Sequence, residues 1–467
     1  MNVNLSERIR ICSYLLVSFL FLFKVNAYGQ PVHFDENSDL ESHLTVSKNS
    51  GKLIFIDMYT DWCGPCKRMD AEVFSQEKLG KRMNAEFINV KINAEKGAGI
   101  SIAKKYYVTS YPTYLFLDHE GTLIHKATGF MEQDKLGKHL TRAQESLTSK
   151  DNLKNLTQKF ESNRKNSTLF YQYLKKRTLL GLDNADLMDE YVSLIGTQEA
   201  AKLPNLQLIA DNASFNARSL KLGKALDVLI SHSFAYDSLE KSEDLETYVQ
   251  MAQLNSLNRA IENRDEALLE KVISYNKYLD LTVFDEEQDD AIRLRYFYAT
   301  KNPEQYKKIA RIFLEDKLLK LSQDSLLKLD GLIYESVKKR MEGRSKEPLN
   351  PEQKKHLLTY RHTQTIAVNR GILSVCQRWM ELNPRSNEMS QLINWMEHSM
   401  KLMELDQDYY HNIIPKSLSL LAKIQYLKGD RQLAILTKKR AIEALKARDF
   451  EADQELIHDW EQELLAM

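Results

Sequence analysis

Apolar runs of strand length recur in the first third of the chain. Residues 53–59 form one such run, and it is typical of a central strand that is buried on both faces of a sheet. Residues 87–92 predict a second strand, while residues 114–117 and 123–127 predict two more strands around a glycine-containing turn. The first third of the chain is therefore expected to contain four strands.

Apolar side chains at helical spacing lie between and after these strands. A helix is expected to begin within the cysteine motif at residues 62–66 and to continue toward residue 83. Residues 100–107 suit a short helix, and residues 133–146 predict a last helix with its apolar side chains on one face. The order strand, helix, strand, helix, hairpin, helix is an α/β arrangement.

Beyond about residue 149 the pattern changes to long helical periodicities with almost no strand signal. Asn302 and Pro303 predict the start of one helix, because asparagine caps helix N-termini and proline is favoured at the first helical position. Residues 346–351 contain two prolines and predict a break between two helical subdomains. The remainder of the chain is therefore expected to be a large all-α region.

The end of the chain contains one unit with a recognisable spacing of small and apolar residues. The spacing resembles a tetratricopeptide unit of two antiparallel helices, at Leu421, Ala422, Tyr426, Gly429, Ala434 and Ala441. Lys438 stands where that family usually has an aromatic residue. Stacked helical repeats form concave surfaces that bind proteins, so protein partners on this helical region are expected.

The N-terminus has the order of a secretory signal. Arg8 and Arg10 precede an apolar run at residues 11–23, and the small residues Ala27 and Gly29 follow it. The run is shorter than the roughly 20 apolar residues of a membrane-spanning helix, so a cleaved signal peptide is favoured over an N-terminal anchor. We therefore expect an exported protein of the periplasm or cell envelope.

These patterns divide the chain into four segments. A chain of 467 residues is too long for one ordinary domain, because larger cores tend to split. We expect a signal peptide at 1–29, an α/β domain at 30–148, an α-helical region at 149–345 and an α-helical, tetratricopeptide-like region at 346–467.

Composition and charge narrow the classes of function. Hydrophobic residues make up 43% of the chain and charged residues 28%, which is typical of a globular protein and not of a disordered one. The 65 Lys and Arg residues balance 65 Asp and Glu residues, so the chain has no excess of positive charge to attract the phosphate backbone of a nucleic acid. No nucleic-acid partner is therefore expected.

The use of cysteine points to redox chemistry. Removal of the signal takes Cys12 away and leaves Cys63, Cys66 and Cys376. A disulfide scaffold would carry several pairs in a much shorter chain, whereas one Cys-x-x-Cys near a βαβ pattern is typical of a redox pair. Cys376 lies in an apolar run and is interpreted as a small buried residue.

The predicted position of the cysteine pair at a helix start suits thiol chemistry. Unsatisfied backbone N–H groups and aligned peptide dipoles favour a thiolate there, so Cys63 is the expected nucleophile. Cys66 lies one turn inward, where it can attack the mixed disulfide on Cys63 and release a reduced substrate. Trp62 and Pro65 are expected to restrict solvent and to fix the turn.

Metal binding is the alternative for this cysteine spacing. A Cys-x-x-Cys can form half of a zinc site, but tetrahedral zinc needs about four ligands and the chain has no second cysteine pair. His119 and His125 belong to the predicted hairpin, away from the cysteines. Redox chemistry is favoured, with no metal and no cofactor expected.

The residues around the cysteines carry a specific resemblance. Residues 62–67 read WCGPCK, which resembles the active-site motif of the thioredoxin family. The supporting residues of that family have matches, in order, at Asp57, Lys91, Tyr111, Pro112, Thr113 and Gly129. Residues 59–63 and 128–131 are more similar to the C-terminal thioredoxin-like domain of the periplasmic thiol:disulfide interchange protein DsbD. The resemblance covers about residues 35–145.

The resemblance implies a thioredoxin fold and a role for individual residues. Asp57 would be the buried carboxylate that exchanges a proton with Cys66, and Lys91 would be its charge partner. An unpaired buried carboxylate costs several kcal/mol, which favours a functional role for Asp57 over that of a tolerated polar residue. Pro112 would follow a cis peptide bond, and the backbone of Tyr111 would pair with an extended substrate.

The expected site therefore has two sets of residues. The catalytic set is Cys63, Cys66, Asp57 and Lys91, with a redox disulfide between Cys63 and Cys66. The substrate-binding set is Trp62, Gly64, Pro65, Tyr111, Pro112 and Gly129.

The expected function is that of an exported thiol-disulfide oxidoreductase, a reductase or isomerase of protein thiols and disulfides. The alternative is a scaffold or binding protein in which the thioredoxin-like domain is a docking module. DsbD draws electrons through its own membrane helices, whereas the only membrane candidate here is the predicted signal. A separate membrane thiol donor is therefore expected as a partner.

Overall fold

The computed structural model describes residues 31–240, 242–279, 285–344, 348–404, 406, 410–448, 450 and 453–467. The chain divides into two compact units, Met1–Asn255 and Ser256–Met467. The expected signal at 1–29 lies outside the described residues, and the expected boundaries at 148/149 and 345/346 stay predictions. Within the described ranges, no helix combines the length and the apolar character needed to cross a membrane.

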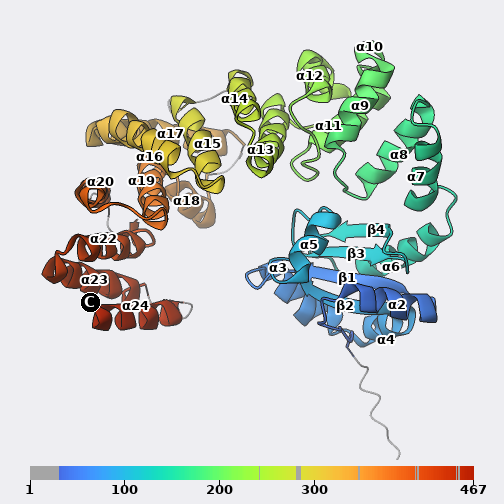
Figure 1. The fold of residues 1–467 in the computed structure, drawn as a ribbon, viewed down its shortest axis with the longest axis horizontal. Helices are drawn as coiled ribbons and strands as arrows, with labels where there is room; N and C mark the ends of the chain where they lie inside the picture. Colours follow the sequence, from blue (N-terminus) through green and yellow to red (C-terminus); the bar gives the residue numbers. More distant parts are fainter. Residues whose placement is uncertain are drawn as a thin grey trace, which may run out of the picture. The chain divides into compact units, whose positions relative to one another are not determined.

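The first unit contains a four-stranded sheet in the order β2-β1-β3-β4 (Figure 1). Strand β1 pairs in parallel with β2 and antiparallel with β3, and β3 and β4 form an antiparallel hairpin. The strands are β1 Leu53–Tyr59, β2 Phe87–Asn93, β3 Thr113–Leu117 and β4 Leu123–Thr128. The four predicted strands are confirmed, each within one residue of its expected bounds.

Two helical layers cover this sheet (Figure 1). One face of the sheet contacts α2 (Leu40–Ser50) and α5 (Ala98–Lys105). On the other face, Phe55 belongs to a core cluster with buried residues of the π-helix η1 (Met69–Phe74), of α4 (Glu77–Glu86) and of α6 (Gln133–Leu147). Strand β1 is buried along almost all of its length because it lies between two strands and between both layers.

The helix after the cysteines is shorter than its periodicity predicts. Helix α3 (Gly64–Arg68) passes directly into η1, and a separate helix, α4, starts at Glu77. The buried residues of η1 are Met69, Val73 and Phe74. A π-helix has a wider turn than an α-helix, so η1 interrupts the α-helical spacing on which the prediction of one continuous helix depended. The expected single helix is therefore three consecutive elements.

Helix α2 precedes the sheet and was not predicted. Its buried residues are the polar His43 and Ser47, so no apolar stripe marks this helix in the sequence. Asp39 caps its first turn by accepting from the backbone N–H of Glu41, and Gly51 ends it in the left-handed conformation.

The rest of the first unit is helical. Phe160, Phe170 and Tyr173 form an aromatic cluster in its core, with ring centroids 4.5 Å apart for Phe160 and each of the other two. The elements are α7 Leu153–Ser162, α8 Ser167–Leu179, α9 Ala185–Ile195, α10 Thr197–Ala200, α11 Leu203–Ala213, α12 Lys224–Ser231, η2 Ser233–Ser238 and α13 Leu245–Asn263, which runs into the second unit.

The second unit is all-helical in its described residues, as the periodicity predicts. Its earlier elements are α14 Glu266–Ser274, η3 Tyr275–Tyr278, α15 Asp285–Ala299, α16 Pro303–Arg311, η4 Ile312–Lys317, η5 Leu318–Lys320, α17 Gln323–Arg344 and α18 Pro351–Leu358. Its later elements are α19 Thr363–Glu381, η6 Ser386–Glu388, α20 Met389–Met403, α22 Ile414–Lys428, α23 Arg431–Lys446 and α24 Gln454–Ala466.

The predicted start of α16 is confirmed. The Asn302 side chain accepts a hydrogen bond from the backbone N–H of Gln305, and Pro303 is the first helical residue. Tyr306 and Ala310, which are four residues apart on this helix, are fully buried.

Helices α22 and α23 pack against each other, with Gly429 in the left-handed conformation between them. Lys438 on α23 is buried, and its ammonium donates to Ser419 Oγ at 2.8 Å and lies 4.6 Å from the centre of the Trp460 ring. The lysine therefore packs against an aromatic ring at the position where an aromatic side chain was expected. The tetratricopeptide likeness of this unit stays a prediction.

Candidate active site

Cys63 and Cys66 form a disulfide at the start of α3, with their Cα atoms 5.3 Å apart. Cys63 is the N-cap residue, and its Sγ accepts a hydrogen bond from the backbone N–H of Cys66 at 3.1 Å. Gly64 and Pro65 form the first turn, where the missing N–H of proline leaves no intrahelical hydrogen bond unmade. Each cysteine exposes 2% of its surface. The backbone N–H of Cys66 thus points at the Cys63 sulfur, as expected for a cysteine at a helix start.

Asp57 lies in the middle of β1 and is completely buried. Its register partners are Lys91 on β2 and Tyr114 on β3. Neither carboxylate oxygen accepts a hydrogen bond from another described residue. The Lys91 ammonium is 3.8 Å from Asp57 Oδ2, which is an ion-pair distance but too long for a hydrogen bond. Burial raises the pKa of Asp57 from 3.8 to about 7, although the Lys91 charge acts in the opposite direction.

Asp70 is a member of this cluster that the sequence analysis did not identify. It lies in η1 and forms a close ion pair with the Lys91 ammonium. Its negative charge also contributes to the raised pKa of Asp57. Asp70 follows Cys66 by four residues, so helical spacing would have placed the two on one face. The pairing with Lys91 comes from a different element and has no local sequence signal.

The substrate-binding residues form a loop beside the cysteine helix. The Tyr111–Pro112 peptide bond is cis, and the carbonyl of Pro112 accepts a hydrogen bond from the backbone N–H of Gly129 at 2.8 Å. Gly129 has φ +83°, a left-handed conformation that glycine adopts without strain. The Tyr111 ring meets the Trp62 ring edge to face, with centroids 5.9 Å apart. The structure therefore brings the two halves of the expected site together.

Trp62 is an exposed aromatic residue of the site. It leaves 67% of its surface accessible, while its indole N–H donates to both carboxylate oxygens of Glu95 at 3.2 and 3.0 Å. Glu95 was not identified from the sequence, because it follows β2 in a turn with no motif. Burial raises the pKa of Tyr111, and the nearby Glu95 charge adds to that effect.

Other titratable groups lie apart from this site. Cys376 is fully buried in α19, and burial raises its pKa. His125 Nε2 lies 2.8 Å from His139 Nδ1, and burial lowers the pKa of His125 to about 4. Across the part of the chain that the structure describes, no group of three or more His, Cys, Asp or Glu side chains could hold a metal ion.

Comparisons with known proteins agree with this geometry. Residues 40–144 match the family description "Thioredoxin-like domain". A thioredoxin H-type from Oryza sativa subsp. indica is 34% identical over 106 residues, which are 23% of this chain and 81% of that protein. The chain belongs to the thioredoxin family. A solution structure of a putative disulphide-isomerase from Bacteroides thetaiotaomicron is 35% identical and matches 26% of this chain and 98% of that one, with a TM-score of 0.24.

DsbD proteins are also relatives of this chain. The thiol:disulfide interchange protein DsbD of Yersinia pestis (strain Pestoides F) is 28% identical over 148 residues, or 28% of this chain. The chain spans about a quarter of the length of that relative. The likeness therefore concerns only part of each protein. Family membership and the Cys63–Cys66 pair together support thiol:disulfide oxidoreductase activity for this domain.

Proposed function

We propose that this protein is an exported disulfide reductase or isomerase that acts on protein disulfides with Cys63 as nucleophile and Cys66 as resolving thiol. The observation that carries the proposal is the position of Cys63, whose sulfur accepts a backbone N–H at the start of α3. Because such a position stabilises negative charge on sulfur, it supports attack by a Cys63 thiolate.

The reaction begins with the dithiol form of the protein. The Cys63 thiolate attacks one sulfur of a client disulfide, forms a mixed disulfide and expels the other client sulfur as a thiolate that takes up a proton. The Cys66 thiolate then attacks Cys63 Sγ and expels the second client thiolate. The client gains two electrons, and the protein is left with the Cys63–Cys66 disulfide that the structure contains. In isomerisation, a client thiol attacks the mixed disulfide instead.

Asp57 acts on the proton of Cys66 in this proposal. A carboxylate with a pKa of about 7 is close to half ionised near neutral pH, so it can accept a proton in one direction and return it in the other. Lys91 keeps part of the Asp57 population ionised, since its charge opposes the effect of burial. Lys91 and Asp70 therefore affect catalysis indirectly, because their charges adjust the pKa of Asp57.

The electrons must come from outside this chain. A dithiol that reduces the Cys63–Cys66 disulfide has to reach the exported compartment, and we infer a membrane thiol protein as the donor. The signal-like order of the first 29 residues and the likeness to DsbD support this part of the proposal. Proteins that bind to the helical regions would bring client proteins, or larger assemblies that contain them, close to the redox domain.

Reduction of insulin by dithiothreitol, catalysed by the purified protein, tests the activity. Turbidity from the released insulin chains should appear earlier with the wild-type protein, while Cys63→Ser should not accelerate it. Cys376→Ser is the matched control, because Cys376 is buried in the second unit and should leave catalysis intact. An acceleration that survives Cys63→Ser would contradict the proposal and favour a scaffold.

A further inference from the structure

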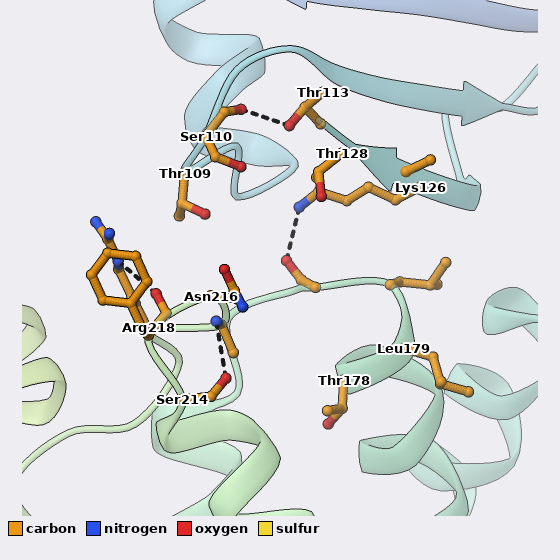
Figure 2. Close-up of a pocket in the computed structure, with 15 residues that line it drawn as sticks. Thr109, Ser110, Thr113, Lys126, Thr128, Thr178, Leu179, Ser214, Asn216 and Arg218 are labelled. Carbon is orange, nitrogen blue, oxygen red and sulfur yellow. Dashed lines mark hydrogen bonds between the residues drawn. The ribbon is translucent and has the colours of Figure 1, made fainter. Parts of the chain in front are cut away.

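A cavity of about 280 Å³ lies within the first unit, between the sheet and the helices that follow it. Figure 2 shows side chains from the two sides facing one another across it. Thr109, Ser110, Thr113, Lys126 and Thr128 come from the thioredoxin domain. Thr178 and Leu179 come from the end of α8, and Ser214, Asn216 and Arg218 come from the loop after α11.

The two sides of this cavity are held together by specific hydrogen bonds. The Lys126 ammonium donates to the carbonyls of Tyr106, Tyr107 and Gly181 at 3.0, 2.7 and 2.9 Å, so it joins β4 to the end of α8. The Tyr107 hydroxyl donates to the carbonyl of Arg218. Both Tyr107 and Arg218 have left-handed backbone conformations, which cost free energy in residues other than glycine and persist because the surrounding contacts hold them.

The cavity is positively charged. Lys126 and Arg218 line it, and its lining contains no Asp or Glu. Neither cation forms an ion pair with a carboxylate in the described part of the chain. Burial lowers the pKa of Lys126 to about 8, with no opposing effect from a negative charge. Lys126 is partly buried and only carbonyl groups contact its ammonium, so an anion nearby would stabilise it.

Several hydrogen-bond donors of the cavity are open to solvent. Arg218 Nε donates to the carbonyl of Phe215, but its terminal nitrogens make no hydrogen bond to another described residue. The same is true, among the residues that the structure describes, of the side chains of Thr109, Ser110, Thr128 and Asn216. Hydroxyl, amide and guanidinium donors gathered in this way match the oxygens of a carboxylate.

The cavity begins at the loop where a client would bind. Thr109, Ser110 and Thr113 flank the cis Tyr111–Pro112 peptide, and Thr128 precedes Gly129, whose N–H holds that loop. An extended client that pairs with the Tyr111 backbone would therefore pass this cavity within a few residues of its cysteine. The exposed side chains of Leu179 and Phe215 lie at the same place and offer apolar contacts.

We infer that this cavity binds an acidic side chain of the client polypeptide, close to the disulfide being reduced, with Arg218 as the main specificity residue. The inference rests on the proposed function and assigns client selection to residues 178–181, at the end of α8, and 214–218, in the loop after α11. A client side chain is favoured over a free small molecule, because the cavity is smaller than the roughly 300–1,000 Å³ of pockets that enclose drug-sized ligands.

Matched peptide disulfides test the inference with the full chain. All peptides share one sequence with an intramolecular disulfide. At each position flanking the cysteines, a set of three peptides carries Glu, Gln or Lys. In the wild-type protein, Glu at one or more positions should raise kcat/KM roughly fivefold over Gln, and added salt should reduce the difference. If no position shows a preference for Glu although all peptides are reduced, the inference fails while the proposed function stands.

Substitutions then locate the preference. Arg218→Gln should reduce the Glu-to-Gln ratio to about one, and Arg218→Glu should reverse the preference in favour of the Lys peptide. Lys159→Gln removes an exposed charge on α7, away from the cavity lining, and should keep the wild-type ratio. A Glu preference that survives both Arg218 variants would overturn the inference. Absence of Cys63-dependent reduction of any peptide would instead overturn the proposed function itself.

Discussion

The carboxylate of Asp57 lies 3.8 Å from the Lys91 ammonium, yet its pKa is raised. Complete burial disfavours the ionised form more than the lysine favours it, since Lys91 also pairs closely with Asp70. The three groups thus set a carboxyl pKa of about 7 in β1, the strand that precedes the cysteine helix in the sequence. A carboxyl group with this property suits proton exchange and reduces the stability of the fold.

Asp57 should make the folded protein less stable as the pH rises. Below pH 3.8 the carboxyl is protonated in both states, and between 3.8 and about 7 it ionises in the unfolded state only, so stability falls across this range and levels off above it. The fall should be on the order of 4 kcal/mol. Asp57→Asn should remove this fall, measured by urea unfolding of the oxidised protein at pH 4.5 and pH 8.

Asp134→Asn is the control for that experiment. Asp134 lies in the first turn of α6 and is exposed, so its replacement should leave the pH dependence of unfolding as it is in the wild type. Equal slopes for wild type and Asp57→Asn would contradict the burial of an uncompensated carboxyl at position 57.

Two neighbours of Asp57 should move the pH profile of catalysis in opposite directions. Lys91→Met removes a positive charge that lowers the pKa of Asp57, so the acid limb of kcat for reduction should shift to higher pH. Asp70→Asn removes a negative charge that raises this pKa, so the limb should shift to lower pH. Lys96→Met, which removes the partner of Asp61, should not shift it. Shifts of the same sign for the two variants would exclude control through Asp57.

The order of strands and helices could be predicted from apolar periodicity, because the strands are short runs between turn residues and α6 has a clear apolar face. Helix α2 could not, since polar side chains fill its buried face. The cysteine pair and the positions of Asp57, Lys91 and Pro112 follow from a motif of known spacing.

Contacts between distant segments were not available from the sequence. Asp70 pairs with a lysine of another element, and Glu95 meets Trp62 across a turn. Lys126 and Arg218 are far apart in sequence and share a cavity only because α8 and the loop after α11 fold back beside β4. Such sites depend on tertiary packing, which cannot be predicted from the local periodicity of apolar residues.

Cys66→Ser should trap clients on Cys63. Without the resolving thiol, the mixed disulfide formed on Cys63 persists, and nonreducing electrophoresis of cells should show adducts that dithiothreitol removes. The double variant Cys63→Ser and Cys66→Ser is the matched control and should form none. Adducts of similar amount in that control would assign the capture to Cys376 and contradict the proposed order of attack.

The proposed export and electron supply can be measured in cells. The mature protein should begin near residue 30 and fractionate with the cell envelope, and acid trapping with thiol labelling should find Cys63 and Cys66 largely reduced. Loss of the membrane thiol donor should leave them oxidised. A protein that is fully oxidised whether or not such a donor is present would contradict this part of the account.

The pKa of the Cys63 thiol in the reduced protein tests the central claim most directly. The rate of alkylation by iodoacetamide, followed from pH 4 to 10 by mass spectrometry of the Cys63 peptide in a Cys376→Ser background, reports the thiolate fraction. The account predicts an inflection well below that of an ordinary thiol, because the helix start and the N–H of Cys66 stabilise the thiolate. An inflection at about 8.5 or above, the range of an ordinary thiol, would contradict it.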